Sequence, residues 1–163
     1  MEYLYAPWRD EYVTGKRGDC VFCDISKNSE NDTKNHVLFR DEVCFVVMNR
    51  YPYTPGHFMV IPHKHIDKLE YLTKEEWQHI STQVQNGSRL LREVFKTRAM
   101  NIGMNIGVEA GAGIAEHLHY HIVPRWERDT NFITTIGGSR VYSVDFDAIY
   151  KKLLAVSGDF FKL

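Results

Sequence analysis

The segment HLHYHIVPRW, residues 117–126, constrains the fold of this chain more than any other stretch. Its three histidines, His117, His119 and His121, alternate with Leu118, Tyr120 and Ile122. Alternation of polar and apolar residues is typical of a half-buried β-strand, on which side chains two residues apart share a face at a spacing of about 7 Å. We therefore predict a strand over residues 117–123. Packing alone does not explain its row of imidazoles, because each ring carries nitrogens that need partners.

Two kinds of chemistry use such a row. Imidazole is a common zinc ligand, and it also acts as a nucleophile or proton carrier. The preceding segment, residues 101–116, is rich in glycine, and its core of Gly111, Ala112 and Gly113 is able to turn backbone N–H groups toward an anion such as phosphate. Imidazoles beside a phosphate cradle indicate phosphoryl or nucleotidyl transfer.

HLHYHIV resembles the motif of the histidine triad superfamily of nucleotide hydrolases and transferases, in which three histidines alternate with apolar residues. Residues 49–65, NRYPYTPGHFMVIPHKH, are similar to a second region of that family. DTNFITTIGGSRV (129–141) and YAPWRDEY (5–12) resemble its bacterial diadenosine tetraphosphate phosphorylase branch. The resemblance implies an α+β fold with a five-stranded antiparallel sheet, packed by one long helix and a C-terminal helix.

Apolar runs between turn residues predict the other strands, which we place over residues 36–41, 43–48, 57–62 and 100–106. Thr73 and Glu76 form a capping box at the start of a helix that runs to Lys96. Gly87 in the middle of this helix weakens it, and a tight helix contact would explain it. We expect His79, on the same helix, to face solvent.

The sequence pattern of residues 143–158 predicts a second helix. Ser143 is its expected cap, residues 144–156 are its body, and Gly158 is its expected end. Before it, Pro124 should end the pairing of the histidine strand, because proline has no N–H for a sheet ladder.

Length and composition predict one soluble domain over residues 1–163. The resemblance implies that this domain comprises an N-terminal zinc-tethered segment (1–35), a catalytic core (36–142) and the C-terminal helix (143–163). A net charge of −1 gives no global electrostatic reason to bind nucleic acid or a membrane surface. The sequence contains no apolar run near 18 residues and no secretory signal pattern at its N-terminus, so we expect a cytoplasmic protein.

The cysteines Cys20 and Cys23 form a CVFC pair, which in a cytoplasmic protein indicates metal binding or redox chemistry. Zinc prefers four ligands, so two more must come from elsewhere. In related bacterial histidine triad proteins that carry such a pair, the site is completed by two histidines, whose counterparts here are His65 and His117. The resemblance thus implies a structural zinc. Cys44 lies in an apolar run and is expected in the core.

The resemblance also assigns substrate contacts. Asn49 would bind the ribose hydroxyls, although from the residues alone it is a turn residue. Asn105 would contact nucleotide or phosphate, and His57 would support the triad from behind. The positions expected to line the base pocket or contact the base are Phe22, Val47 and Trp126, each of which could equally be a core residue.

In the mechanism that the resemblance implies, His119 attacks the α-phosphorus and forms a nucleotidyl-imidazole. A backbone carbonyl that accepts from Nδ1 would leave Nε2 as the nucleophile. His121 would form a hydrogen bond to the α-phosphate or to the scissile bridging oxygen. His117 would serve mainly to anchor the strand and as a zinc ligand. Phosphate then yields ADP and ATP from diadenosine tetraphosphate, whereas water yields AMP and ATP. Gly113 departs from the family, which commonly has a hydroxyl or amide side chain there, and this leaves the acceptor open.

Other functions stay open at this point. The chain could hydrolyse dinucleoside polyphosphates or nucleoside phosphoramidates to AMP. It could use all three histidines as ligands of a catalytic metal, or it could bind nucleotides without catalysis. The family is usually homodimeric, through edge strands and the long helix, so we expect a homodimer.

Overall fold

The computed structural model describes residues 20–138, 142 and 144–162, so the segment 5–12 and the expected helix cap Ser143 lie outside the described residues. Its elements in chain order are α2 (Val21–Lys27), η2 (Ser29–Asn31), α3 (Asp32–Asn35), β1 (Val37–Arg40), β2 (Cys44–Met48), β3 (Phe58–Pro62), η3 (Leu69–Tyr71), α4 (Lys74–Phe95), β4 (Ala99–Gly103), η4 (Val108–Ala110), β5 (Tyr120–Arg125), α5 (Phe132–Ile136) and α6 (Phe146–Phe160).

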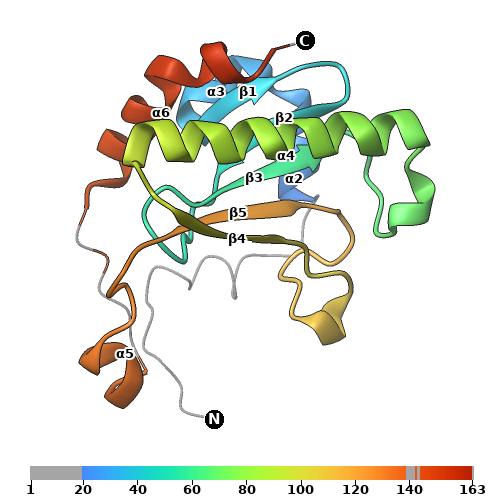
Figure 1. Cartoon of the computed structure of the whole chain (residues 1–163). Coiled ribbons are helices and arrows are strands. Elements are labelled where there is room, and N and C mark those ends of the chain that lie inside the picture. The colour runs from blue at the N-terminus through green and yellow to red at the C-terminus, as the bar shows by residue number, and fades with distance from the viewer. Residues whose placement is uncertain (1–19, 139–141, 143, 163) are drawn as a thin grey trace.

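The strands form one antiparallel sheet in the order β1-β2-β3-β5-β4 (Figure 1). This confirms the predicted α+β fold with five antiparallel strands. Short links allow neighbouring strands to pair antiparallel. Between β1 and β2 the carboxylate of Asp41 closes the turn, because its Oδ1 accepts from the N–H groups of Val43 at 2.8 Å and Cys44 at 2.9 Å.

The largest differences from the predicted strand boundaries are in β5 and β4. β5 begins at Tyr120 instead of His117, and it continues through Pro124, which pairs with Met100 of β4. The pairing of β5 with β3 stops at Ile122. Beyond that residue β5 needs backbone N–H donors only on the side of β4, so the strand tolerates a proline at position 124. β4 ends at Gly103, before the expected Ile106.

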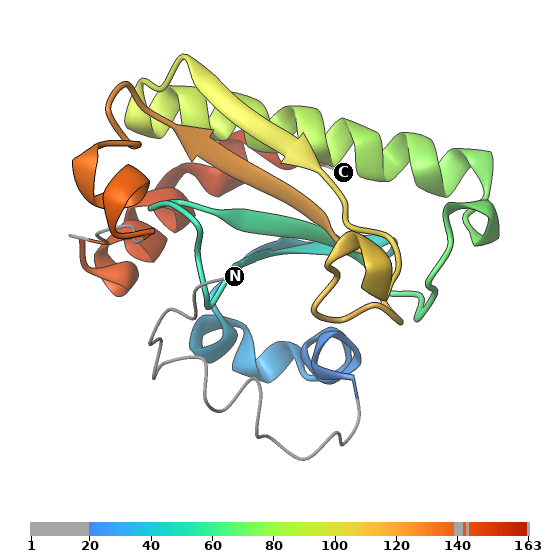
Figure 2. The ribbon, with the colours of Figure 1, turned by 90° about the horizontal axis from the view of Figure 1, so that it is seen from below.

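The long helix α4 covers one face of the sheet (Figure 2). It begins in the predicted capping box, in which Glu76 N–H donates to Thr73 Oγ1 and the Glu76 carboxylate accepts from Thr73 N–H. A Cβ on Gly87 would lie 2.8 Å from Ile122 and 2.9 Å from Phe58, so this glycine lets the helix approach its own sheet closely. The predicted tight contact is therefore within the chain.

Helix α6 packs beside α4 and against β1. Its N-terminus is capped by Asp145, whose carboxylate accepts from Ala148 N–H at 2.7 Å, and the helix continues past Gly158 to Phe160. The expected end at Gly158 was wrong, and two side chains anchor the helix to β1, one in its second turn and one near its end. Tyr150 Oη donates to Val37 O at 3.1 Å, and Ser157 Oγ donates to Leu38 O at 3.0 Å.

The opposite face of the sheet is covered by the segment that contains α2 and α3 (Figure 2). A second apolar cluster lies there, made of Phe22, Val37, Phe45, Val47, Met59 and Ile61. The helices of the described part of the chain include none that is both long enough and apolar enough to cross a bilayer.

Candidate active site

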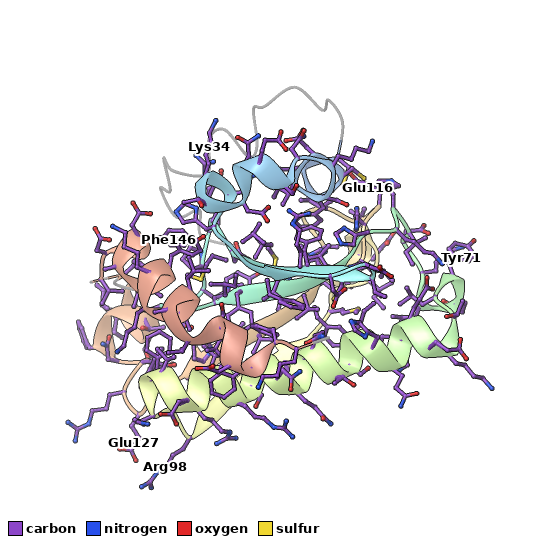
Figure 3. All side chains as sticks on the ribbon, turned by 90° about the horizontal axis from the view of Figure 1, so that it is seen from above. Lys34, Tyr71, Arg98, Glu116, Glu127 and Phe146 are labelled. Carbon is purple, nitrogen blue, oxygen red and sulfur yellow. The ribbon has the colours of Figure 1, made fainter. Side chains whose placement is uncertain are left out.

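The histidine row runs along the α2 side of the sheet. It begins after Glu116, and β5 then leads to Glu127 near the C-terminal end of α4 (Figure 3). The alternation places Leu118 and Ile122 in the core, at 3% and 0% exposure. Of the three histidines only His121 belongs to the assigned strand, because before Tyr120 the chain is held by a bond from Leu118 N–H to Ile66 O rather than by a strand ladder.

His119 is buried, at 6% exposure, and one of its nitrogens is committed. Nδ1 lies 2.8 Å from the carbonyl oxygen of His117, which can only accept, so Nδ1 carries the proton and Nε2 carries the lone pair. Burial lowers the pKa of His119, and the bond to His117 O opposes this only in part. The ring is therefore neutral at neutral pH, as a nucleophile must be.

The free nitrogen of His119 is accessible. Among the described residues Nε2 has no hydrogen-bond partner, and none of their fully buried side-chain nitrogen or oxygen atoms lacks one. Nε2 must therefore reach solvent, although the ring as a whole is enclosed.

His57 and His121 form a relay with a fixed direction. The N–H of Tyr53 donates to His57 Nδ1 at 3.2 Å, so the proton of His57 is on Nε2. This Nε2–H donates to Nδ1 of His121 at 2.9 Å, which leaves the proton of His121 on its own Nε2. Burial, followed by repulsion from the neighbouring imidazoles, lowers the pKa of His57 to about 3 and that of His121 to about 4.

His119 and His121 thus present opposite chemistry to the same space. Their ring centroids are 4.9 Å apart with the rings nearly perpendicular. One ring offers a lone pair and the other an N–H, which is the combination that a displacement at phosphorus needs: a nucleophile and a donor to an oxygen.

Apolar residues and one amide flank these rings. Phe22 is buried, and its ring centroid lies 5.1 Å from that of His119. Val47 belongs to the same apolar cluster. Asn49 Oδ1 accepts from Tyr51 N–H at 2.9 Å, which turns the amide Nδ2 toward His57 Nε2 at 3.4 Å. Since both of these nitrogens carry hydrogen, this approach is a contact and not a hydrogen bond.

In the glycine-rich loop, two backbone N–H groups already donate to carbonyl oxygens of the loop itself. Gly111 N–H donates to Val108 O at 2.9 Å, and Ala112 N–H donates to Gly107 O at 3.3 Å. Gly111 has φ +86°, a conformation that glycine adopts without strain. Of the three residues predicted to cradle phosphate, Gly113 alone has its amide without a backbone acceptor among the described residues. Asn105 lies beyond the end of β4 and is half-buried.

Trp126 is set apart from the reactive histidines within the chain. Its ring lies 6.0 Å from Phe95 of α4, on the helix-covered side of the sheet. The prediction that it contacts the base gains no support from this position. Gly103, which the sequence reasoning did not single out, pairs directly with His121, and a Cβ there would meet nothing within 4 Å among the described residues. No sequence pattern marks this open space, because it depends on the strand register.

Four predicted metal ligands come together beside the row, and we call them the Cys/His cluster: Cys20, Cys23, His65 and His117. Their donor atoms lie within 4.8 Å of one another, with Sγ–Nδ1 distances of 3.3 Å (Cys20–His117), 3.1 Å (Cys23–His65) and 3.7 Å (Cys23–His117). Ligand atoms around a tetrahedral zinc lie roughly 3.3–3.8 Å apart, as its bond lengths require. His117 Nε2 donates to Pro62 O at 2.9 Å, so only Nδ1 of this ring is directed at the cluster.

A second group of possible ligands, Asp41, Cys44 and His79, lies on the helix-covered face. Here Asp41 Oδ2 and His79 Nε2 are 2.6 Å apart, which is a hydrogen-bond distance and too short for two ligands of one metal. His79, expected to face solvent, is 30% exposed in its side chain, and its Nε2 pairs with the buried carboxylate of Asp41. Within the described residues these two groups are the ones that gather three or more donors, and neither includes His119 or His121.

Comparison with known proteins identifies the family. The pattern described as "HIT domain" matches residues 30–128. The chain belongs to the HIT domain family. The match covers β1 to β5, and thus all three histidines of the row, whereas Cys20, Cys23 and Phe22 precede it.

Relatives of this HIT chain include named enzymes. An AP-4-A phosphorylase of Mycobacterium tuberculosis (strain ATCC 25618 / H37Rv) is 43% identical over 111 residues, which are 68% of this chain and 57% of that protein. An asymmetrical bis(5'-nucleosyl)-tetraphosphatase of Schizosaccharomyces pombe is 35% identical over 95 residues, 58% of this chain and 52% of that protein. The alignments therefore span little more than half of these relatives. A Zn-bound histidine triad family protein from Mycobacterium smegmatis has a similar structure, with a TM-score of 0.70 and 27% identity over 86% of this chain and 94% of that one.

Proposed function

We propose that this protein cleaves dinucleoside polyphosphates by nucleotidyl transfer, with phosphorolysis of diadenosine tetraphosphate to ADP and ATP as its favoured reaction. The observation that carries the proposal is the arrangement of His119: Nδ1 is tied to His117 O at 2.8 Å, and Nε2 is unprotonated and accessible. The names of the relatives support the substrate class, since one is a phosphorylase and the other a tetraphosphatase.

In the first step, Nε2 of His119 attacks the α-phosphorus of diadenosine tetraphosphate and forms a P–N bond as the bond to the bridging oxygen breaks, and ATP leaves with that oxygen. The Nε2–H of His121 lies beside it and donates to that bridging oxygen or to the α-phosphate, since Nδ1 already accepts from His57. In the second step, inorganic phosphate attacks the nucleotidyl-imidazole and releases ADP. Water in its place releases AMP.

For the nucleotide itself, we propose that Phe22 and Val47 contact the base and Asn49 the ribose, all on the face that carries His119. Gly113 is the proposed phosphate donor of the glycine loop, with Asn105 beyond the end of β4. Trp126, whose ring lies 6.0 Å from that of Phe95, stays a proposed contact of the base.

Product analysis tests the reaction. The protein is incubated with diadenosine tetraphosphate, with and without inorganic phosphate, and the nucleotides are separated by ion-exchange chromatography. We expect ADP and ATP in the presence of phosphate, and a ³²P-adenylylated protein after rapid acid quenching. AMP and ATP under both conditions would make the protein a hydrolase, and no cleavage under either condition would contradict the proposal.

We also propose that the Cys/His cluster binds a structural Zn²⁺. The spacing of its donor atoms fits a tetrahedral ion, and the ion would tie α2 to the segment before β5. Metal analysis of the purified protein should give one zinc per chain, which Cys23→Ser should lose and the control Cys44→Ala should keep. Retention of zinc by Cys23→Ser would contradict this assignment. The three cysteines are free of disulfides, which is typical of a reducing compartment, so we propose a cytoplasmic location.

A homodimer through β4 is the remaining proposal. β4 is an edge strand of the sheet, and Ile102 on it is 44% exposed. Unpaired strand edges favour pairing with a second copy. Sedimentation equilibrium should give twice the chain mass, and Ile102→Glu should shift the equilibrium toward monomer. A monomeric wild type at micromolar concentration would refute the dimer.

A further inference from the structure

The short helix α2 carries two residues of the proposed function, Phe22 and Cys23. It is seven residues long and has no side-chain hydrogen bond at its N-cap, so contacts from elsewhere in the chain must hold it. We propose that His63 is a positioning residue that fixes the C-terminal half of α2 and thereby keeps Phe22 against His119. This inference rests on the proposed nucleotide site.

The segment that follows β3 contacts α2 at two points. His65 Nδ1 lies 3.1 Å from Cys23 Sγ, and His63 Nδ1 lies 2.7 Å from Ser26 Oγ. Residues three apart in a helix share a face, so two histidines spaced by one residue meet the helix at two positions one turn apart. The first contact belongs to the Cys/His cluster. The second contact joins His63 to the Ser26 hydroxyl, which is not part of the Cys/His cluster, so its role is to hold the helix in place.

The hydrogen bonds of His63 have a fixed direction. Nε2 lies 2.9 Å from the carbonyl oxygen of Asp41, which can only accept, so Nε2 carries the proton. Nδ1 is then the acceptor, and the Ser26 hydroxyl donates to it. The ring also packs against Phe45 of β2, at 5.4 Å between centroids. His63 therefore connects α2 to the turn between β1 and β2, which is part of the rigid sheet.

Arg40 holds the same end of the helix. Its Nη1 donates to Ser26 O and its Nη2 to Ile25 O, both at 3.0 Å, and these carbonyls belong to the last turn of α2. The last carbonyls of a helix have no partner within it, so this guanidinium satisfies groups that otherwise need water. A side chain from β1 and one from the segment after β3 thus converge on one end of α2.

The consequence concerns Phe22, which lies one turn before Ser26. Its ring is 5% exposed and contacts the rings of His117 at 5.5 Å and His119 at 5.1 Å. If the bond to Ser26 is lost, α2 keeps the Cys/His cluster at its start, and at its end it keeps the bonds from Arg40 and the apolar packing of Ile25. Its tilt is then less well determined, and Phe22 is less well placed for a base.

The test measures AMP binding by calorimetry and the KM and kcat for diadenosine tetraphosphate. His63→Ala and Ser26→Ala should each weaken AMP binding and raise KM about three- to tenfold, as the loss of one hydrogen bond predicts, while kcat stays within about twofold. His63→Asn keeps an acceptor near the position of Nδ1 and should restore most of the affinity. The matched control is Lys64→Ala, on the same segment, whose side chain pairs with Glu76 and not with α2.

A double-mutant cycle with Phe22→Ala shows whether the effect passes through Phe22. If it does, adding His63→Ala to Phe22→Ala costs no further AMP affinity. A further loss as large as in the wild-type background would overturn the inference, as would a lower melting temperature with unchanged AMP affinity in both His63→Ala and Ser26→Ala. AMP binding does not require turnover, so a protein that binds AMP but leaves diadenosine tetraphosphate intact would refute the proposed reaction and leave this inference standing.

Discussion

The two faces of the sheet bury polar groups in different ways. On the face under α4 and α6, buried polar groups pair with each other or with backbone, as Asp41 does with His79 and Ser157 does with Leu38 O. On the α2 face, His119 is buried and His121 is half-buried, yet each has one committed nitrogen and one left accessible. The first arrangement holds the fold together, and the second keeps two neutral imidazoles available for a substrate.

This difference separates stability from reactivity across one sheet. Changes on the α4 face should alter the free energy of unfolding and leave turnover nearly intact, whereas loss of the His119 side chain should lower turnover with little change in stability at neutral pH. Two measurements test this separation, and a third tests how the buried imidazoles affect stability in acid.

The largest expected effect is on the histidine face. His119→Ala removes the proposed nucleophile, so kcat should fall by at least about a thousandfold, as is usual for the loss of a covalent nucleophile. The melting temperature should change by only a few degrees, because Nδ1 of this ring makes a single backbone bond. Turnover is followed by ATP release and folding by circular dichroism. Undiminished turnover in the variant would remove the basis of the mechanism.

Acidification should weaken the fold through the same face. Unfolded histidines bind a proton near pH 6.5, whereas burial lowers the pKa of His57 to about 3 and that of His121 to about 4 in the folded protein. Between pH 6.5 and 5 the unfolded chain therefore holds more protons, and the free energy of unfolding falls by about 1.4 kcal/mol per pH unit for each such histidine. Because an unfolded histidine is only half protonated at pH 6.5, the two rings together account for about 3 kcal/mol over this range.

Urea unfolding at several pH values between 7 and 5 measures this slope. His57→Asn removes one of the two groups and should make the fall shallower. An equal slope in wild type and variant would show that the buried imidazoles do not control acid stability.

The smallest expected effect is on the α4 face. Gly87→Val places methyl groups where a Cβ already lies 2.8 Å from Ile122 and 2.9 Å from Phe58, so overpacking should cost about 1–3 kcal/mol of stability. The KM for diadenosine tetraphosphate should stay within about twofold of wild type, since the reactive histidines lie on the other face. A large rise in KM with unchanged stability would show that the two faces are coupled.

The sequence predicted what depends on local pattern. Alternation correctly placed Leu118 and Ile122 in the core, and the pair Thr73 and Glu76 fixed the start of α4. The expected backbone acceptor for Nδ1 of His119 is also present, as His117 O. The resemblance to a family, rather than spacing, predicted that His65 and His117 would meet the two cysteines.

What the sequence did not predict depends on partners that are distant in the chain. The pairing of His79 with Asp41 and that of His63 with Ser26 could not be predicted from the sequence, because neither pair follows a helix or strand period. The start of β5 was missed because alternation determines which way side chains face, whereas strand assignment depends on ladder bonds that begin only at Tyr120. The direction of the relay from Tyr53 through His57 depends on contacts that only the folded structure brings together.

Gly103 has a practical consequence. It faces His121 across the β4–β5 ladder, its φ needs no glycine, and a Cβ there would be free of neighbours among the described residues. Side chains of graded size at this single position would therefore narrow the space beside the proton donor step by step, with little remodelling of the backbone. The strand register thus supplies an adjustable wall, at which an engineer could select among acceptors or leaving groups.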